Sequence, residues 1–444
     1  MLPKLRRSAS DGRVRASGSF VAVILLFGAL FSCAQAASSH RRKATPKRPI
    51  VVGYFPQWQL YADAPYSVKA LDQSGGAGLL DQINYAQGFV KDGHCSVADP
   101  NADLNMVFTA VNSVNGVADD PTSRFHGYFH QIQELKRKYP HLKLLISLEG
   151  RAADFAADAQ PAARKQFVRS CIDTFIHGHF AEGINVPGLF DGFDIDWESP
   201  HQEDGENFRE LLREFREQMN AVRPGLRLSI AVGPSPRMLG GVDFRSIIPY
   251  LDQVGVMNYD YAGPWMQRSG FIAPLFRDPA HPGGSIDRGM NDYIAAGVPA
   301  QMLLMGMPFY GYGWKVPEGD NHGLFQAGPG IRGEEYPYHR IRNMKGKYVL
   351  YRDPLSHAPW LYDGDTFFTF EDVSSLSYKA AYAAKHSLGG VMIWELSGDT
   401  ADGELLHTVH RSLNRPPAWY TFPPDASPSG APQQTVRTRS TEAP

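Results

Sequence analysis

The chain has 444 residues, of which 43% are hydrophobic and 20% charged, and its formal net charge at pH 7 is −2. This composition is typical of globular proteins and is sufficient for one large barrel or two smaller domains. The near-neutral charge argues against the basic surface that binding to nucleic acid requires.

The first 36 residues have the three-part pattern of a secretory signal peptide. Basic residues between Lys4 and Arg15 precede an apolar run from Phe20 to Phe31, and Ala34 and Ala36 follow. The run is too short to span a bilayer. We therefore expect cleavage after Ala36 and secretion to the periplasm or medium without stable membrane association. Lipid anchoring through Cys33 is the alternative.

Removing residues 1–36 takes five basic residues and one acidic residue from the chain, so the remainder carries about six negative charges. Residues 37–48 are a basic linker. Residues 415–444 are rich in Pro, Ser, Thr and Gln and too poor in apolar residues to fold, so a disordered tail is predicted there.

Between these ends, apolar strand-like runs alternate with amphipathic stretches. The helical period is clearest from Phe208 to Val222, where apolar residues recur every three or four positions. The eight runs are 50–55, 83–90, 142–148, 189–197, 226–232, 253–259, 302–309 and 389–395. They predict an α/β fold, a (β/α)8 TIM barrel over residues 49–414. A doubly wound sheet would need a Gly-rich phosphate loop after the first strand, where the sequence has 54–58, Tyr-Phe-Pro-Gln-Trp.

The gap from Tyr310 to Leu388 is too long for one helix. It contains short strand-like pieces, which predict a small α+β insertion at residues 313–370 between strands 7 and 8, and then a helix over 375–387. Long connections also follow the second strand (91–123) and the sixth (260–286), on the face where barrel enzymes build their sites.

Cys95 and Cys171 are the cysteines outside the signal segment. Export would permit a disulfide. Cys171, however, lies in the apolar stripe of a predicted helix, with Phe167 and Phe175. We expect a buried free thiol there, and the disulfide is the alternative.

The candidate site is the stretch from Leu189 to Ser199. In an extended strand, Asp194, Asp196 and Glu198 share one face, while apolar side chains occupy the other. Unpaired buried carboxylates are costly, and mutual repulsion keeps at least one protonated near neutral pH. A protonated carboxyl in such a row suits a general acid, and Glu198, nearest the strand's C-terminal end, is the candidate. Asp191 is out of phase with the row.

A metal site is the first rival interpretation, since clustered carboxylates suit Mg²⁺ or Ca²⁺. Side chains at alternate positions over this strand spread across about 13 Å, too far to converge on one ion. We therefore expect no metal and no cofactor.

The four carboxylates Asp191, Asp194, Asp196 and Glu198 match the DxxDxDxE signature of glycoside hydrolase family 18, so the chain resembles a bacterial-type chitinase. Two further segments resemble the family: Met257-Asn258-Tyr259-Asp260 is like its MxYD segment, and the run ending in Trp394 is like its closing strand. Together the matches extend over residues 49–414.

The resemblance implies that Glu198 is the acid and base, that Asp196 orients the substrate's acetamide, and that Asp194 shares a proton with Asp196. Tyr259 and Asp260 would hold the N-acetyl group, Met257 would line its pocket, and Trp394 would form the floor under the sugar. Further candidate substrate contacts are Ser147, Tyr54, Trp58 and Trp265. For Trp314, a position in the cleft and a position in the core are both open. Asp191 would support the structure.

The implied reaction is hydrolysis of β-1,4 bonds between N-acetylglucosamine units of chitin, with retention, by a monomeric enzyme. The rivals are a non-enzymatic chitinase-like sugar-binding protein and an endo-β-N-acetylglucosaminidase that acts on N-glycans. Two residues depart from the family pattern: Glu149 replaces a glycine of SxGG, with Arg151 expected to neutralise it, and Tyr312 stands where an arginine is usual.

Overall fold

The computed structural model describes residues 48–417, apart from positions 64, 282, 318, 334 and 345. The predicted signal peptide with Cys33, nearly all of the predicted linker, and the tail from residue 418 onward lie outside these described residues. Across the described part of the chain, none of the helices combines the length and the apolar character that a membrane span requires.

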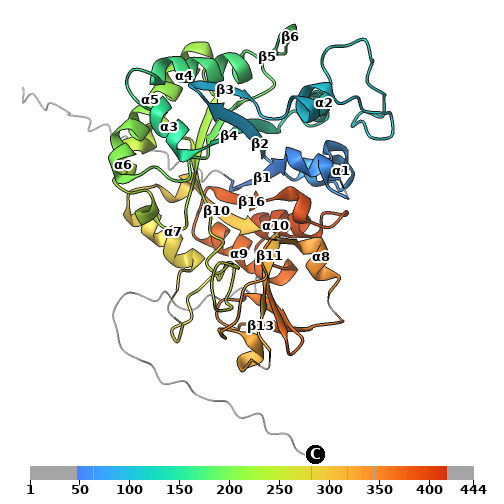
Figure 1. The fold of residues 1–444 in the computed structure, drawn as a ribbon, viewed down its shortest axis with the longest axis vertical. Helices are drawn as coiled ribbons and strands as arrows, with labels where there is room; N and C mark the ends of the chain where they lie inside the picture. Colours follow the sequence, from blue (N-terminus) through green and yellow to red (C-terminus); the bar gives the residue numbers. More distant parts are fainter. Residues whose placement is uncertain are drawn as a thin grey trace, which may run out of the picture. The chain divides into compact units, whose positions relative to one another are not determined.

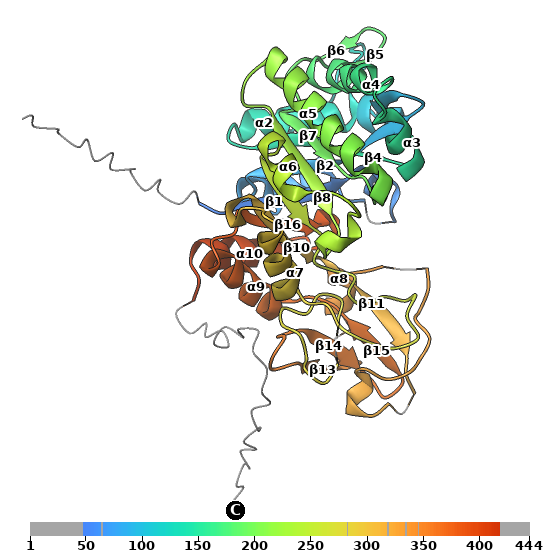
Figure 2. The same cartoon turned by 90° about the vertical axis from the view of Figure 1, so that its left-hand side faces the viewer.

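The core of the fold is a closed barrel of eight parallel strands (Figures 1 and 2). They are β1 (Ile50–Pro56), β2 (Gln82–Lys91), β4 (Lys143–Gly150), β7 (Gly192–Ile195), β8 (Arg227–Val232), β9 (Gln253–Val256), β10 (Leu303–Pro308) and β16 (Gly390–Trp394). Each strand pairs with the next in this series, and β1 also pairs with β16, which closes the barrel. The predicted fold is confirmed, and each of the eight predicted runs overlaps one barrel strand.

Helices cover the outside of the strands (Figure 1). They are α1 (Val68–Gln73), α2 (Gly127–Lys138), α3 (Ala152–Asp158), α4 (Arg164–Cys171), α5 (Gly205–Val222), α6 (Phe244–Ile247), α7 (Ile286–Ala295), α9 (Val373–Lys385) and α10 (Glu404–Asn414). In α5 the predicted apolar stripe is buried from Phe208 to Met219, and only its last member, Val222, is exposed. Burial of this stripe against the barrel stabilises a helix whose opposite face is charged.

The connection between β10 and α9 forms a second, antiparallel sheet, which lies beside α8 (Tyr338–Arg342) in Figure 2. Its strands are β11 (Tyr310–Lys315), β12 (Tyr336–Pro337), β13 (Val349–Arg352), β14 (Pro359–Tyr362) and β15 (Thr366–Thr369). This is the α+β insertion that the sequence predicted. β11 follows β10 directly, so the insertion begins at the rim of the barrel.

Two small hairpins complete the fold. β3 (His94–Val97) pairs antiparallel with the end of β2, and β5 (His179–Ala181) pairs with β6 (Ile184–Asn185). One turn of π-helix, Ile172–Ile176, continues α4.

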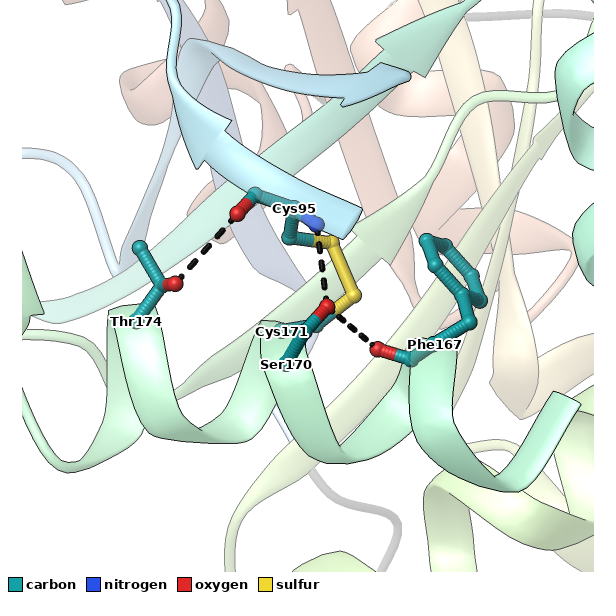
Figure 3. Close-up of a disulfide and its surroundings, with 5 residues drawn as sticks. All are labelled: Cys95, Phe167, Ser170, Cys171 and Thr174. Atoms are coloured by element: carbon teal, nitrogen blue, oxygen red, sulfur yellow. Dashed lines mark hydrogen bonds between the residues drawn. A yellow bond between two sulfur atoms is a disulfide. The ribbon is translucent and has the colours of Figure 1, made fainter. Parts of the chain in front are cut away.

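The prediction of a free thiol at Cys171 is wrong, because Cys95 and Cys171 form a disulfide (Figure 3). Their Cα atoms lie 4.7 Å apart, although the residues are separated by 76 positions. Cys171 is fully buried, as its apolar stripe indicated, but β3 folds back over α4 and places Cys95 against it. Helical periodicity shows that a side chain is buried and does not show which strand covers it.

Side chains of the helix also fix the backbone of Cys95. Its N–H donates to Ser170 Oγ at 3.0 Å, and its carbonyl accepts from Thr174 Oγ1 at 3.3 Å (Figure 3). The covalent bond and these hydrogen bonds together attach the β2–β3 hairpin to α4.

We expect the Cys95→Ala/Cys171→Ala double variant to lose about 3 kcal/mol of stability, because the bond closes a long loop and so restricts the unfolded chain. The measurement is the midpoint of urea unfolding. Dithiothreitol should lower the midpoint of the wild type by a similar amount and leave that of the double variant unchanged. A double variant as stable as the oxidised wild type would contradict the prediction.

Candidate active site

Asp194, Asp196 and Glu198 are called the acidic row here, and Asp194 is its enclosed member. It is 1% exposed and lies inside the barrel on β7. Its carboxylate accepts hydrogen bonds from Tyr54 Oη at 2.6 Å, Ser229 Oγ at 2.5 Å and Ser147 Oγ at 3.2 Å. Burial raises the pKa of Asp194, and these hydrogen bonds oppose the rise.

Asp196 and Glu198 follow Asp194 toward the C-terminal end of the barrel and line an open cavity. Burial raises the pKa of Asp196 well above its ordinary value, and the charges of Glu198, Asp194 and Glu149 raise it further. Glu198 is more exposed, yet partial desolvation and the charge of Asp260 raise its pKa as well. Asp196 and Glu198 together therefore retain a proton at a pH at which isolated carboxyls are ionised.

One oxygen of this pair has no protein partner. Asp196 Oδ1 is buried and accepts no hydrogen bond from any described residue. Buried polar atoms are nearly always paired, and this one belongs to a residue that lines the cavity, so it is a candidate acceptor for a hydrogen bond from a ligand.

The cavity has a volume of about 390 Å³. Its wall comes from three barrel strands (β1, β8 and β16), the segments that follow β7, β8 and β9, and the insertion. Among its described lining residues are Tyr54, Asp196, Glu198, Met257, Tyr259, Asp260, Trp265, Tyr310, Glu335 and Trp394. Most of the predicted site residues are therefore brought together, although they are spread over 341 positions of the sequence, from Tyr54 to Trp394.

Tyr259 and Asp260 stand at the exit of β9. Asp260 has a left-handed backbone with φ of 61° and accepts a hydrogen bond from Tyr310 Oη at 2.7 Å. Desolvation raises the pKa of Asp260, and hydrogen bonds from Tyr310 and Tyr312 oppose the rise. Tyr312, which replaces an arginine in the family pattern, thus supplies a neutral donor to this carboxylate.

Aromatic rings line the cavity, among them Tyr54, Trp265 and Trp394. The Trp394 ring lies 5.3 Å from Tyr54 and 6.0 Å from Trp58, measured between ring centroids, and Trp58 is not itself a lining residue. Trp58 is 36% exposed and Trp265 55% exposed, so both present ring surface to solvent. Trp314 is fully buried against Phe367 and belongs to the core.

The structure corrects the expectations for Ser147 and Arg151, and it places Asp191, which was expected to support the structure, away from the cavity. Ser147 is fully buried beneath the cavity, so it supports Asp194 and cannot contact a substrate. Arg151 does not neutralise Glu149, since its guanidinium pairs with Asp154 at 2.6 and 2.7 Å. Asp191 lies at the opposite end of β7, where it accepts from Lys136 Nζ at 2.7 Å and from the N–H of Leu144 at 3.0 Å.

Sequence reasoning missed Ser229, Tyr310 and Glu335. Ser229 is the residue that faces Asp194 in the β7–β8 register, so correct strand pairing would have identified it. Tyr310 begins β11 and Glu335 lies in the insertion, where no periodic pattern points toward the barrel. Among the residues that the structure describes, no group of three or more His, Cys, Asp or Glu side chains is arranged to hold a metal ion.

Comparison with known proteins decides the family. The model of the family "Glycosyl hydrolases family 18" matches residues 50–399. The chain belongs to glycosyl hydrolase family 18. The match covers all eight barrel strands and the insertion of this family 18 chain.

Its relatives include several named chitinases. Chitinase C of Streptomyces lividans is 30% identical over 371 residues, which cover 80% of this chain and 58% of that protein. Chitinase A1 of Niallia circulans is 30% identical over 410 residues, covering 79% and 56% respectively. The family 18 chain thus spans less than two thirds of the length of these relatives.

A solved structure is similar over nearly its whole length. The catalytic domain of psychrophilic chitinase B from Arthrobacter TAD20 superposes with a TM-score of 0.75 and 32% identity, over 83% of this chain and 96% of that one.

Proposed function

We propose that this family 18 chain is a secreted chitinase that hydrolyses β-1,4 linkages between N-acetylglucosamine units with retention of anomeric configuration. The observation that carries the proposal is the acidic row, which runs from the enclosed Asp194 to the open Glu198 and includes Asp196, a cavity-lining residue with an unpaired buried oxygen. Relatives of the chain are named chitinases, which supports the same function.

In this mechanism the reacting sugar lies on Trp394, because an aromatic ring suits the C–H face of a pyranose. The N–H of its acetamide donates to Asp196 Oδ1, and Tyr259, Asp260 and Met257 enclose the rest of the N-acetyl group. This geometry turns the acetamide oxygen toward the anomeric carbon. Substrate-assisted attack of this kind replaces the second carboxylate of ordinary glycosidases.

The proton of Glu198 goes to the glycosidic oxygen as the bond from that oxygen to the anomeric carbon breaks. The acetamide oxygen forms the new bond at the anomeric carbon, which gives an oxazolinium ion that Asp196 stabilises. Glu198 then takes a proton from water, and the resulting hydroxide attacks the anomeric carbon and restores the acetamide. The raised pKa of Glu198 keeps it protonated at a higher pH than an ordinary carboxyl, so activity is lost as rising pH removes that proton.

Time-resolved product analysis with the hexamer of N-acetylglucosamine tests this function. We expect shorter oligomers whose new reducing ends are initially the β-anomer, observed by NMR. Products that begin as the α-anomer would exclude retention. Binding without cleavage would support a chitinase-like binding protein, and preferential release of N-glycans from a glycoprotein would support the endo-β-N-acetylglucosaminidase.

A matched oligomer carries free glucosamine at the reacting sugar and is otherwise identical. It lacks the acetamide nucleophile, so we expect cleavage at that position to fall by roughly 10³-fold or more, in line with the loss of a well-oriented intramolecular reactant. Efficient cleavage there would contradict the substrate-assisted mechanism.

A further inference from the structure

Glu149 is an acidic residue that the proposed mechanism does not use. It lies near the end of β4, and its neighbour Leu148 accepts the backbone hydrogen bond of Asp196 at 3.1 Å. Ser147, two residues earlier, points into the barrel toward Asp194. By strand alternation Glu149 shares that inward face, one level nearer the rim, beside Asp196.

Among the described residues, the groups that face Glu149 include carboxylates and an amide. Asp194 on β7, and Asp196 and Glu198 on the segment that follows it, have charges that interact with that of Glu149. On β2 it faces the neutral amide of Gln87, which donates to both carboxylate oxygens of Glu149, to Oε1 at 3.1 Å, in the orientation that satisfies both polar atoms of the amide.

Two basic residues near this end of β4 are directed elsewhere. Arg151 pairs with Asp154, and Lys91 also interacts with Asp154. Beyond Glu198, on the β9 side, stand Asp260 and the un-ionised Tyr259. Four carboxylates, from β4, β7 and the segment after β7, therefore share one region, and no described residue forms an ion pair with Glu149, Asp194, Asp196 or Glu198.

This arrangement makes the charge of Glu149 depend on pH near neutrality. Desolvation, together with the charges of Glu198 and Asp194, raises the pKa of Glu149 to about 7. The side chain is therefore neutral in acid and becomes negative as the pH rises through 7. Once negative, it disfavours a further ionisation of the neighbouring carboxyls, since a like charge favours their protonated form.

We propose that Glu149 is a positioning residue for the catalytic proton: when ionised, it holds that proton on Glu198 and Asp196 and so keeps the acid competent at mildly alkaline pH. The inference rests on the proposed function, in which Glu198 must be protonated to act. A glycine at this position, as in the usual family pattern, cannot supply this charge.

The test is the pH dependence of kcat/KM for the N-acetylglucosamine hexamer between pH 5 and 10, in the wild type and in Glu149→Gln. Glutamine keeps the size and polarity of the side chain and removes its charge. We expect the alkaline limb of the profile to move to lower pH by at least about one unit, because a charge within about 12 Å shifts a neighbouring pKa by that much or more at an effective dielectric of about 20. Below pH 6, where Glu149 is neutral, kcat/KM of the wild type and of Glu149→Gln should agree within about twofold.

Two matched variants separate charge from structure. Glu149→Asp keeps the carboxylate and should retain the alkaline limb near its wild-type position. Glu203→Gln removes an exposed acidic side chain outside the cavity, and should leave the profile in place. If Glu149→Gln does not fold, as judged by circular dichroism, Glu149→Gly takes its place.

An unmoved alkaline limb in Glu149→Gln, or an equal loss of activity at every pH, would overturn the inference and leave the proposed function intact. Absence of hexamer cleavage by the wild type would instead refute the proposed function. The two failures are therefore distinguishable in one set of measurements.

Discussion

Replacing Glu198 by glutamine should lower kcat for chitin oligomers by about 10³-fold while the protein still binds them, because glutamine has no proton to give to the leaving oxygen. The substitution preserves the shape of the side chain in the cavity wall. No described residue donates a hydrogen bond to Glu198 that glutamine would break, so the dissociation constant should change by no more than about threefold. Single-turnover kinetics with the hexamer and calorimetric titration of the same oligomer measure the two quantities.

The control is Glu203→Gln, which makes the same chemical change five residues later, on an exposed side chain outside the cavity. It should leave both kcat and binding unchanged. Hydrolysis at the wild-type rate by the Glu198 variant would remove Glu198 from the reaction. Loss of binding as large as the loss of turnover would show that the substitution had damaged the cavity and not only the acid.

The second large effect concerns stability. Replacing Lys379 by methionine should destabilise the fold by about 4 kcal/mol, because it leaves a buried carboxylate without its partner. Lys379 on α9 forms an ion pair with Glu371, and both side chains are fully buried. The ammonium group also donates to the carbonyl of Ala273 at 2.5 Å, which ties α9 to the long loop after β9. The free energy of urea unfolding measures the loss.

The matched control removes both charges. The Lys379→Met/Glu371→Gln double variant leaves no unpaired ion, so it should recover much of the stability that the single variant loses. If the single and double variants prove equally unstable, packing and the hydrogen bond to Ala273 would account for the effect, and the ion pair would not.

Much of the fold could be predicted because its helices and strands follow from local sequence patterns. Strands buried on both faces are continuous apolar runs, and amphipathic helices show a period of 3.6 residues. The run 302–309 and the stripe from Phe208 to Met219 are examples, and both became the elements that their patterns predicted. The row Asp194, Asp196 and Glu198 was predicted from alternation along one strand, and in the structure only Asp194 lies on β7, while Asp196 and Glu198 follow the end of the strand and line the cavity.

Side-chain partners that depend on turns or on contacts between distant segments were not predictable in this way. The pairing of Arg151 with Asp154, in place of Glu149, depends on how the chain turns into α3. The contribution of Tyr310 and Glu335 to the cavity depends on how the insertion folds back over the barrel rim. Neither the turn nor the fold-back leaves a periodic signal in the sequence.

The sequence by itself therefore determined the barrel, its insertion and the acidic row, because each depends on residues a few positions apart. Only the tertiary structure decided that Cys95 bonds to Cys171, that Ser147 lies beneath the cavity, and that Asp196 keeps one unpaired oxygen. The physical reason is that bonding partners and burial depend on which surfaces meet after folding, and many arrangements of loops are compatible with the same local periodicity.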